Sequence, residues 1–274
     1  SLRERKRTGE RKAAMGGDNM DRGAARAAAE LRVQLAQMTA ASQMLERCAW
    51  DEKSRGYLAA LNQGICRMLR TVGRLELAGR LSKESPQLEL AAADLGELTA
   101  ELGQRMEGLL ERTGVRLAVS GPEGLTAQVD ETLIRQMLLE LTANAAAAGK
   151  TVRVTLEKAG NRAVFTVADA GPRISPESVA GLFSDEREQI PDWRRGGMGL
   201  AIAHRIASLH GGTLMADCAP GQGMRVSASI PLGEGEGGVL KGRALRWDGG
   251  GFDEALVGLS PLLPAQAFLP ENLE

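Results

Sequence analysis

Apolar residues recur at alternating intervals of three and four positions in two segments near the start of the chain. The first series is Leu31, Leu35, Met38, Ala41 or Ser42, and Leu45, and the second is Leu58, Leu61, Ile65, Met68, Val72 and Leu75. This heptad spacing predicts two helices, each with one apolar seam. The stretch CAWDEKSRG between them mixes charge, Ser and Gly and predicts a turn, so we expect an antiparallel hairpin. Two helices leave apolar surface uncovered, which a dimer forming a four-helix bundle would bury.

The pattern changes after Ser85-Pro86. The sequence predicts a helix over 88–114, a strand over 115–120, a helix over 130–149, a hairpin over 151–171, a glycine-led helix over 196–212 and a hairpin over 213–231. Helices and antiparallel strands in this order predict an α+β fold with helices on one face of a mixed sheet. Glycine is dense from Gly233 to Gly251 and predicts a linker. The segment after it is apolar but interrupted by prolines, and its sequence indicates no role.

Composition excludes several classes of protein. The 274 residues are 43% hydrophobic and 25% charged, with a net charge of -1, which does not favour nucleic acid or a membrane surface as the main partner. The basic stretch RERKRTGERK predicts a solvated terminus or a connector to an upstream module. Three widely spaced cysteines predict neither a disulfide framework nor a zinc site and fit a reducing cytoplasm. No apolar run is long enough to span a membrane, and an upstream sensor is compatible with a chain that starts Ser-Leu.

Candidate chemistry lies on the predicted helices and at one strand end. Glu140 and Asn144 are four positions apart and share a helix face, where a carboxylate can orient a hydroxyl and an amide oxygen can join a magnesium shell. Asp169 follows a strand and precedes Ala170-Gly171, which suits a carboxylate that accepts from an exocyclic amine. Gly197-Met198-Gly199 opens a helix, whose free N–H groups favour phosphate. Each of these motifs is a weak signal alone, and the order in which they follow one another along the chain is more specific.

From Ala24 to Pro231 the chain resembles the sensor histidine kinases of two-component systems, within the GHKL ATPases. ELTANA is similar to the N box, DAGPRI to the first glycine box, LFSDE to the F box, and GGMGLAIAHRIASLHGG to the second glycine box and its helix. The resemblance implies a helical-hairpin dimerisation domain followed by a Bergerat-type α/β sandwich that binds ATP. The expected parts are a basic or disordered connector (1–22), the hairpin (23–86), the ATPase domain (87–232) and a Gly/Pro-rich tail (233–274).

The resemblance also assigns site residues. It implies that Asn144 holds Mg²⁺, that Asp169 reads adenine and that Glu140 is a general base or orienting group. The other residues implied to bind ATP are Gly171, Ile174, Gly197, Met198, Gly199 and Leu200. Several positions depart from the family pattern and predict weaker binding: Arg173, Ala147, Ala148, Met224 and Arg225. Arg194 and Arg195 are candidates for compensating charge.

The first helix departs most. AELRVQL aligns with the family's H box, so Ala29 occupies the phosphoacceptor position, while Glu30, Arg32 and Leu35 match. Imidazole is phosphorylated through a nucleophilic ring nitrogen, and a methyl group has no lone pair. Autophosphorylation at the usual place is therefore predicted to be absent, whether Ala29 is natural or engineered. His204 and His210 are the only histidines, and we expect a helix-surface position for His204 and a helix-end role for His210.

Four functions remain open at this stage. The first is a dimeric regulator that binds ATP and Mg²⁺ and is sensed by a response regulator or by another kinase. The second is a kinase that phosphorylates Ser, Thr or His on a partner. The third is a phosphatase for a partner's phospho-Asp, which Val33 in place of the family's Thr weakens. The fourth is a scaffold that binds no nucleotide.

Overall fold

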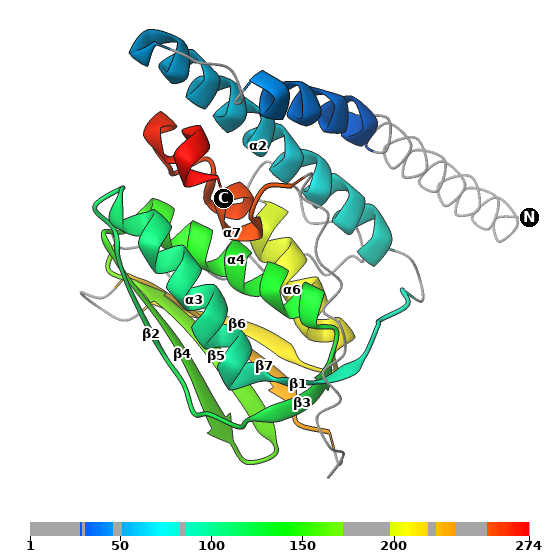
Figure 1. Cartoon of the computed structure of the whole chain (residues 1–274). Coiled ribbons are helices and arrows are strands. Elements are labelled where there is room, and N and C mark those ends of the chain that lie inside the picture. The colour runs from blue at the N-terminus through cyan, green and yellow to red at the C-terminus, as the bar shows by residue number, and fades with distance from the viewer. Residues whose placement is uncertain are drawn as a thin grey trace, which may run out of the picture.

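The computed structural model describes Ala28 and residues 31–45, 51–82, 86–171, 198–218, 223–233 and 251–273. Figure 1 shows a stack of layers: two long helices lie on top, the C-terminal segment lies beneath them, and three helices follow on one face of a sheet. The C-terminal segment thus lies between the helical hairpin and the α+β part. The end of α2 also contacts the α+β part directly, through a hydrogen bond from Arg205 to the Leu81 carbonyl.

The first two helices pair as the heptad pattern predicts. Residues 31–45 are helical, and α2 spans Glu52–Leu81. Arg32 pairs with Glu76 through two hydrogen bonds from Nε of 2.8 and 3.0 Å, and Ser42 bonds Asn62. Because the partner number falls as the first number rises, the helices are antiparallel.

The second helix begins inside the segment predicted as a turn. The N-cap of α2 is Asp51, whose carboxylate accepts from the backbone N–H of Ser54 at 2.8 Å. Ser54 and Gly56 therefore lie inside α2, although both were expected in the turn. An N-cap aspartate satisfies orphan donors of the first turn, which outweighs the weak helix propensity of Ser and Gly at these positions.

The heptad residues divide into two sets. One set is buried within the chain: Leu35, Ser42, Leu58, Ile65 and Val72. The other set consists of large hydrophobic side chains that stay 37–45% exposed: Leu31, Met38, Leu45, Leu61, Met68 and Leu75. In each exposed series the members are seven positions apart, so each helix keeps an apolar stripe that no described residue covers.

A five-stranded mixed sheet forms the base of the molecule. Its strand order is β2-β4-β5-β7-β6; β2 and β4 are parallel, and the other neighbours are antiparallel. The bounds are β2 Arg116–Ser120, β4 Thr151–Ala159, β5 Arg162–Asp169, β6 Thr213–Cys218 and β7 Met224–Pro231. Three helices cover one face (Figure 1): α3 Leu95–Glu111, α4 Glu131–Ala148 and α6 Met198–Leu209. The predicted α+β architecture with helices on one face of a mixed sheet is confirmed.

The predicted helix over 88–114 begins too early. Residues Ala91–Asp94 form β1, which pairs antiparallel with β3 (Thr126–Val129), and α3 begins only at Leu95. Asp94 caps α3 by accepting from the N–H groups of Gly96 and Glu97 at 2.8 and 3.1 Å. Strand pairing thus overrides the helix propensity of the three alanines in β1, and the aspartate fixes where the helix starts.

Residues 251–273, which the sequence analysis placed in a tail without a role, are folded. They contain α7 (Glu254–Leu259) and two short 3₁₀ helices, η1 (Ala265–Phe268) and η2 (Pro270–Asn272). The side chains of Leu256 and Phe268 are 2% and 0% exposed. A segment that buries such side chains is part of the hydrophobic core.

Polar contacts join this C-terminal segment to both neighbouring layers. The hydrogen bonds are Gln63 to the Leu263 carbonyl (2.7 Å), Asn62 to the Phe268 carbonyl (3.3 Å), Arg105 to Asp253 (2.7 Å) and Arg135 to Glu254 (2.5 Å). The first two come from α2, and the others come from α3 and α4. The C-terminal segment therefore links the helical hairpin to the helices of the sheet domain.

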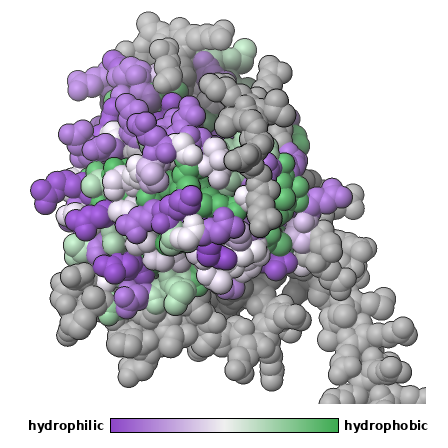
Figure 2. All heavy atoms as spheres, turned by 90° about the horizontal axis from the view of Figure 1, so that it is seen from below, coloured by the Kyte–Doolittle hydropathy of each residue, from purple (hydrophilic) through white to green (hydrophobic). Residues whose placement is uncertain are grey.

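The view from below (Figure 2) shows mostly hydrophilic side chains with smaller hydrophobic patches between them. On the sheet, residues that face the helices alternate with residues that are more exposed, as in β5, where Ala163, Phe165 and Val167 are buried. Such alternation is typical of an antiparallel sheet with one face on the core and one towards water.

Candidate functional site

Two of the predicted site residues project from α4. Asp130 is the N-cap of this helix and Gly149 its C-cap, as the sequence indicates. Glu140 is 1% exposed, whereas Asn144, one turn later, is partly exposed. The amide of Asn144 makes no hydrogen bond to any described residue, so both its donor and its acceptor can serve a ligand.

Gly199, in the first turn of α6, brings these residues together. A Cβ atom built at this position would lie 2.8 Å from Oε2 of Glu140, 3.2 Å from Nδ2 of Asn144 and 3.2 Å from Nη2 of Arg74. Only glycine fits here without a shift of these polar atoms. The structure therefore brings Glu140, Asn144 and Gly199 to one point, with Arg74 of α2 as a fourth member that the sequence analysis did not foresee.

Asp169 marks the other end of the candidate site. It ends β5, is 8% exposed, and accepts a hydrogen bond from the N–H of Gly171 at 2.7 Å through Oδ1. A Cβ at Gly171 would lie 2.8 Å from this oxygen, and the backbone of Gly223 also packs directly on Asp169. Within the described residues Oδ2 of Asp169 has no hydrogen-bond partner and suits an amine donor.

Glu140 is the most strongly bound carboxylate of the site. Arg74 donates to it twice, from Nε to Oε1 at 2.6 Å and from Nη2 to Oε2, in a bidentate pair. Gln136 donates to Oε1 at 3.0 Å, and Arg70 Nη2 lies 3.4 Å from Oε2. Both oxygens of Glu140 are thus occupied by donors, so a ligand group reaches them only where one of these donors moves.

The two arginines share a largely buried environment. The side chains of Arg70 and Arg74 are 14% and 17% exposed. Burial lowers the pKa of Arg70 to about 10; the charge of Glu140 opposes this effect and the charge of Arg74 adds to it. Arg70 is therefore still protonated near pH 7.

A signal for these residues exists in the sequence, since Arg67, Arg70 and Arg74 have i, i+3, i+7 spacing on α2.

The remaining predicted site residues lie in different surroundings. Met198 is partly buried and packs against the core, and Leu200 is 6% exposed and belongs to the core. Ala29, Ile174 and Gly197 lie outside the described residues, as do Arg173, Arg194 and Arg195.

The residues present fit ATP and Mg²⁺. Three glycines keep side chains away from the site residues: Gly199 beside Glu140 and Asn144, and Gly171 and Gly223 beside Asp169. No described residues form a cluster of three or more His, Cys, Asp or Glu side chains able to hold a metal alone. Mg²⁺ commonly takes one or two protein ligands together with substrate phosphates, so an amide such as Asn144 suits this role only alongside nucleotide.

The two histidines have the positions expected for them. His204 is exposed on α6. Nε2 of His210 accepts from the backbone N–H of Asp130 at 3.0 Å, and Nδ1 lies 2.8 Å from the Ile206 carbonyl. In this arrangement Nε2 is the acceptor and Nδ1 is the donor. His210 thus ties the end of α6 to the start of α4.

The fold and this site define an ATPase domain of the GHKL class. Residues 129–234 match the family described as "Histidine kinase-, DNA gyrase B-, and HSP90-like ATPase". Within this class the chain is similar to sensor histidine kinases: 187 residues are 31% identical to sensor protein RstB of Escherichia coli (66% of this chain, 43% of RstB). A second relative is the alginate biosynthesis sensor protein KinB of Pseudomonas aeruginosa, 28% identical over 216 residues (76% of this chain, 36% of KinB).

A solved structure supports the same assignment. Full-length ShkA in complex with AMPPNP superposes with a TM-score of 0.63 at 26% identity, over 76% of this chain and 45% of ShkA. The chain thus spans less than half the length of these relatives. Among the described helices, none is long and apolar enough to cross a membrane.

Proposed function

We propose that this chain is a nucleotide-binding signalling protein of the histidine kinase type that does not autophosphorylate at the usual position. One observation carries the proposal: Glu140 and Asn144 meet at Gly199, while the first helix has Ala29 where the family has its phosphoacceptor. The site keeps the groups for a triphosphate, and the helix lacks the imidazole that would receive the terminal phosphate.

In this proposal each end of the site binds one part of ATP. Oδ2 of Asp169 accepts from the adenine amine, and Asn144 joins the Mg²⁺ shell beside the phosphates. Gly171, Gly197 and Gly199 allow close approach of backbone, and Met198 and Ile174 line the pocket. Glu140, held by Arg74, orients groups near the phosphates. ATP supplies charge that reorganises the contacts of α2, and a partner senses the result.

The exposed stripes of the hairpin support a homodimer. Leu31, Met38 and Leu45 on the first helix and Leu61, Met68 and Leu75 on α2 repeat every seven residues and stay exposed in one chain. A second copy placed against them completes a four-helix bundle in which these side chains become the seam. A response regulator or another kinase in the cytoplasm is the partner class we propose for such a dimer.

Calorimetric titration with Mg-ATP tests nucleotide binding. The unaltered protein is expected to bind with micromolar or weaker affinity, and Asn144→Ala to lose binding. Asn161→Ala is the matched control, because Asn161 is an exposed turn residue between β4 and β5. The proposal is contradicted if the unaltered protein does not bind Mg-ATP, or if Asn144→Ala binds Mg-ATP with the same affinity as the unaltered protein.

Radiolabelled ATP tests the second half of the proposal. Because Ala29 has no nucleophile, no acid-labile label is expected on the chain after incubation with ATP and Mg²⁺. Acid-labile label on the purified chain would show that a histidine is phosphorylated. Acid-stable label on a partner would instead indicate a hydroxyl kinase.

A further inference from the structure

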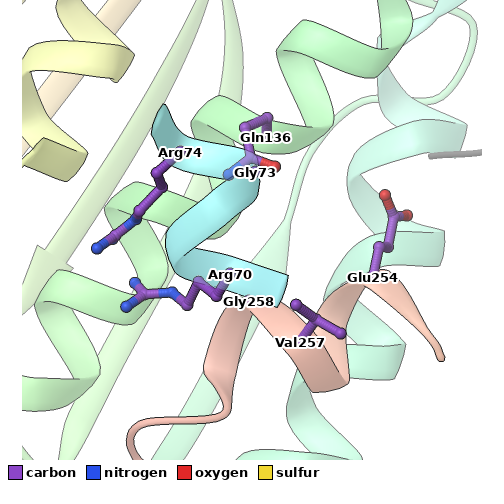
Figure 3. Close-up of a pocket in the computed structure, with 7 residues that line it drawn as sticks. All are labelled: Arg70, Gly73, Arg74, Gln136, Glu254, Val257 and Gly258. Carbon is purple, nitrogen blue, oxygen red and sulfur yellow. The ribbon is translucent and has the colours of Figure 1, made fainter. Parts of the chain in front are cut away.

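The helical hairpin contributes a cation to the nucleotide site. Arg74 belongs to α2, yet its Nη2 lies 3.2 Å from the Cβ position of Gly199, the same distance as Nδ2 of Asn144. In Figure 3 the guanidinium groups of Arg70 and Arg74 point in the same direction, away from Glu254 and Val257 of the C-terminal segment. The two charges are therefore directed to the α4–α6 side, where Gly199 lies.

The charges of this cluster do not balance. Arg70 and Arg74 share one carboxylate, that of Glu140, and Nε of Arg70 is buried without a hydrogen-bond partner. Among the described residues, Arg70, Arg74 and Glu140 thus carry an excess of one positive charge in a largely buried place, and the nearby Glu254 is paired with Arg135. Such an excess of positive charge favours the binding of an anion on the α4–α6 side, where Gly199 lies.

The last turn of α4 and the first turn of α6, which flank the phosphate end, supply no cation among the residues that the structure describes. The last turn of α4 has no basic residue and consists of Ala145–Ala148, and the first turn of α6 begins Met198-Gly199-Leu200. A nucleotide triphosphate carries several negative charges and is normally met by Lys or Arg as well as Mg²⁺. The arginines of α2 are placed to fill this need.

The cavity beside the arginines does not hold the anion itself. It lies between α2, α4 and α7, with Arg70, Gln136 and Gly258 in its wall, and has a volume of about 20 Å³. This is room for one water molecule, which could serve the buried Nε of Arg70. A phosphate must therefore reach Arg74 from the side of Gly199.

We propose that Arg74 is a phosphate-contacting residue: when ATP binds, its guanidinium exchanges one of its bonds to Glu140 for an oxygen of the terminal phosphates. The inference rests on the proposed function and adds a residue to it from outside the ATPase domain. Glu140 keeps Arg70 and Gln136 as partners after the exchange. Because Arg74 is part of α2, the contact connects nucleotide directly to the helical hairpin.

The test compares ligands with and without phosphates. Mg-ATP is titrated by calorimetry, and adenosine is measured by competition, on the unaltered chain, Arg74→Ala and Arg74→Lys. Loss of one charge-assisted contact is expected to weaken ATP by about tenfold or more in Arg74→Ala, with a smaller loss in Arg74→Lys, and to leave adenosine unchanged. Arg67→Ala is the matched control, since Arg67 is on the same face of α2 but is directed to the Ser260 carbonyl.

A second variant separates phosphate contact from misfolding. Arg74→Gln combined with Glu140→Gln removes both charges of this pair and keeps hydrogen-bonding groups, so its thermal midpoint is expected to fall by less than the sum of the two single shifts while ATP binding is still weakened. Unchanged or tighter ATP binding by Arg74→Ala overturns the inference. If the unaltered chain binds no ATP, or if Asn144→Ala is neutral, the proposed function fails instead. An equal loss for ATP and adenosine shows a structural role for Arg74 and also overturns the inference.

Discussion

Glu140→Gln is the substitution whose effect on stability follows most directly from the structure. Glu140 is 1% exposed and accepts hydrogen bonds from Arg74 at 2.6 Å and Gln136 at 3.0 Å, with Arg70 at 3.4 Å. Glutamine has nearly the same shape but no charge. The variant therefore leaves two guanidinium groups, 14% and 17% exposed, facing each other without a counter-ion.

The magnitude follows from the cost of leaving a buried charge unpaired. Removing one partner of a buried ion pair costs about 3–5 kcal/mol. The arginines keep some contact with water, so we expect the lower end, about 3 kcal/mol, which lowers the thermal midpoint by about 6–12 °C in a domain of this size. Arg74→Gln alone is expected to be destabilising for the same reason, because Glu140 is then left with weaker partners.

A double-mutant cycle separates the pair from its surroundings. Urea unfolding followed by circular dichroism gives the free energy for the unaltered chain, the two single variants and Glu140→Gln with Arg74→Gln. The double variant is expected to lose less stability than the sum of the two single losses, with a coupling of about 2 kcal/mol. Glu101→Gln is the control: Glu101 is 60% exposed, pairs with Arg135 at 3.3 Å, and should change stability by less than about 0.5 kcal/mol. A Glu140→Gln variant as stable as the control, or a coupling near zero, would refute the reasoning.

Three further predictions concern other parts of the chain. Phe268→Ala removes a 0% exposed ring from the C-terminal segment and is expected to lower the free energy of unfolding by about 3 kcal/mol; an unaffected urea midpoint would show that this segment does not contribute to the core. Burial raises the pKa of Cys66 from 9.0 to about 12, so between these values the unfolded thiol ionises while the native one stays neutral. Stability should then fall with rising pH by about 1.4 kcal/mol per unit more steeply than in Cys66→Ala, and parallel pH profiles would contradict this. His210→Ala should destabilise by about 1–2 kcal/mol and His204→Ala by less than about 0.5 kcal/mol, as measured by urea unfolding, since only His210 bridges Asp130 and Ile206; equal effects would exclude that bridge.

Local patterns predicted the elements that local forces determine. The heptads gave the antiparallel hairpin, and the alternation of Val152, Val154 and Leu156 gave β4 and its turn to β5 at Gly160, where φ is 60°. The order of boxes indicated Glu140, Asn144 and Gly199 as one site, and the structure brings them together.

Long-range contacts determine what the sequence did not reveal. The alanines of β1 form a strand only because β3 lies beside them, and the prolines of residues 251–273 interrupt helical periodicity without preventing burial. Arg74 and Glu140 are 66 positions apart, and nothing in the local pattern pairs them. The i, i+3, i+7 arginines were visible, but a row of arginines on a helix normally indicates a solvated face.

The contacts of α2 join the helical hairpin closely to the rest of the chain. Arg205 of α6 donates to the Leu81 carbonyl at the end of α2 at 2.9 Å, Arg74 reaches Glu140, and the C-terminal segment joins α2 to α3 and α4. The proposed function requires no phosphate transfer to the first helix, so these close contacts between the hairpin and the rest of the chain are compatible with it. The same contacts allow a change at the phosphate end to affect α2 without a large motion. Arg74 belongs to α2, so a movement of its side chain at the site directly changes the contacts of this helix.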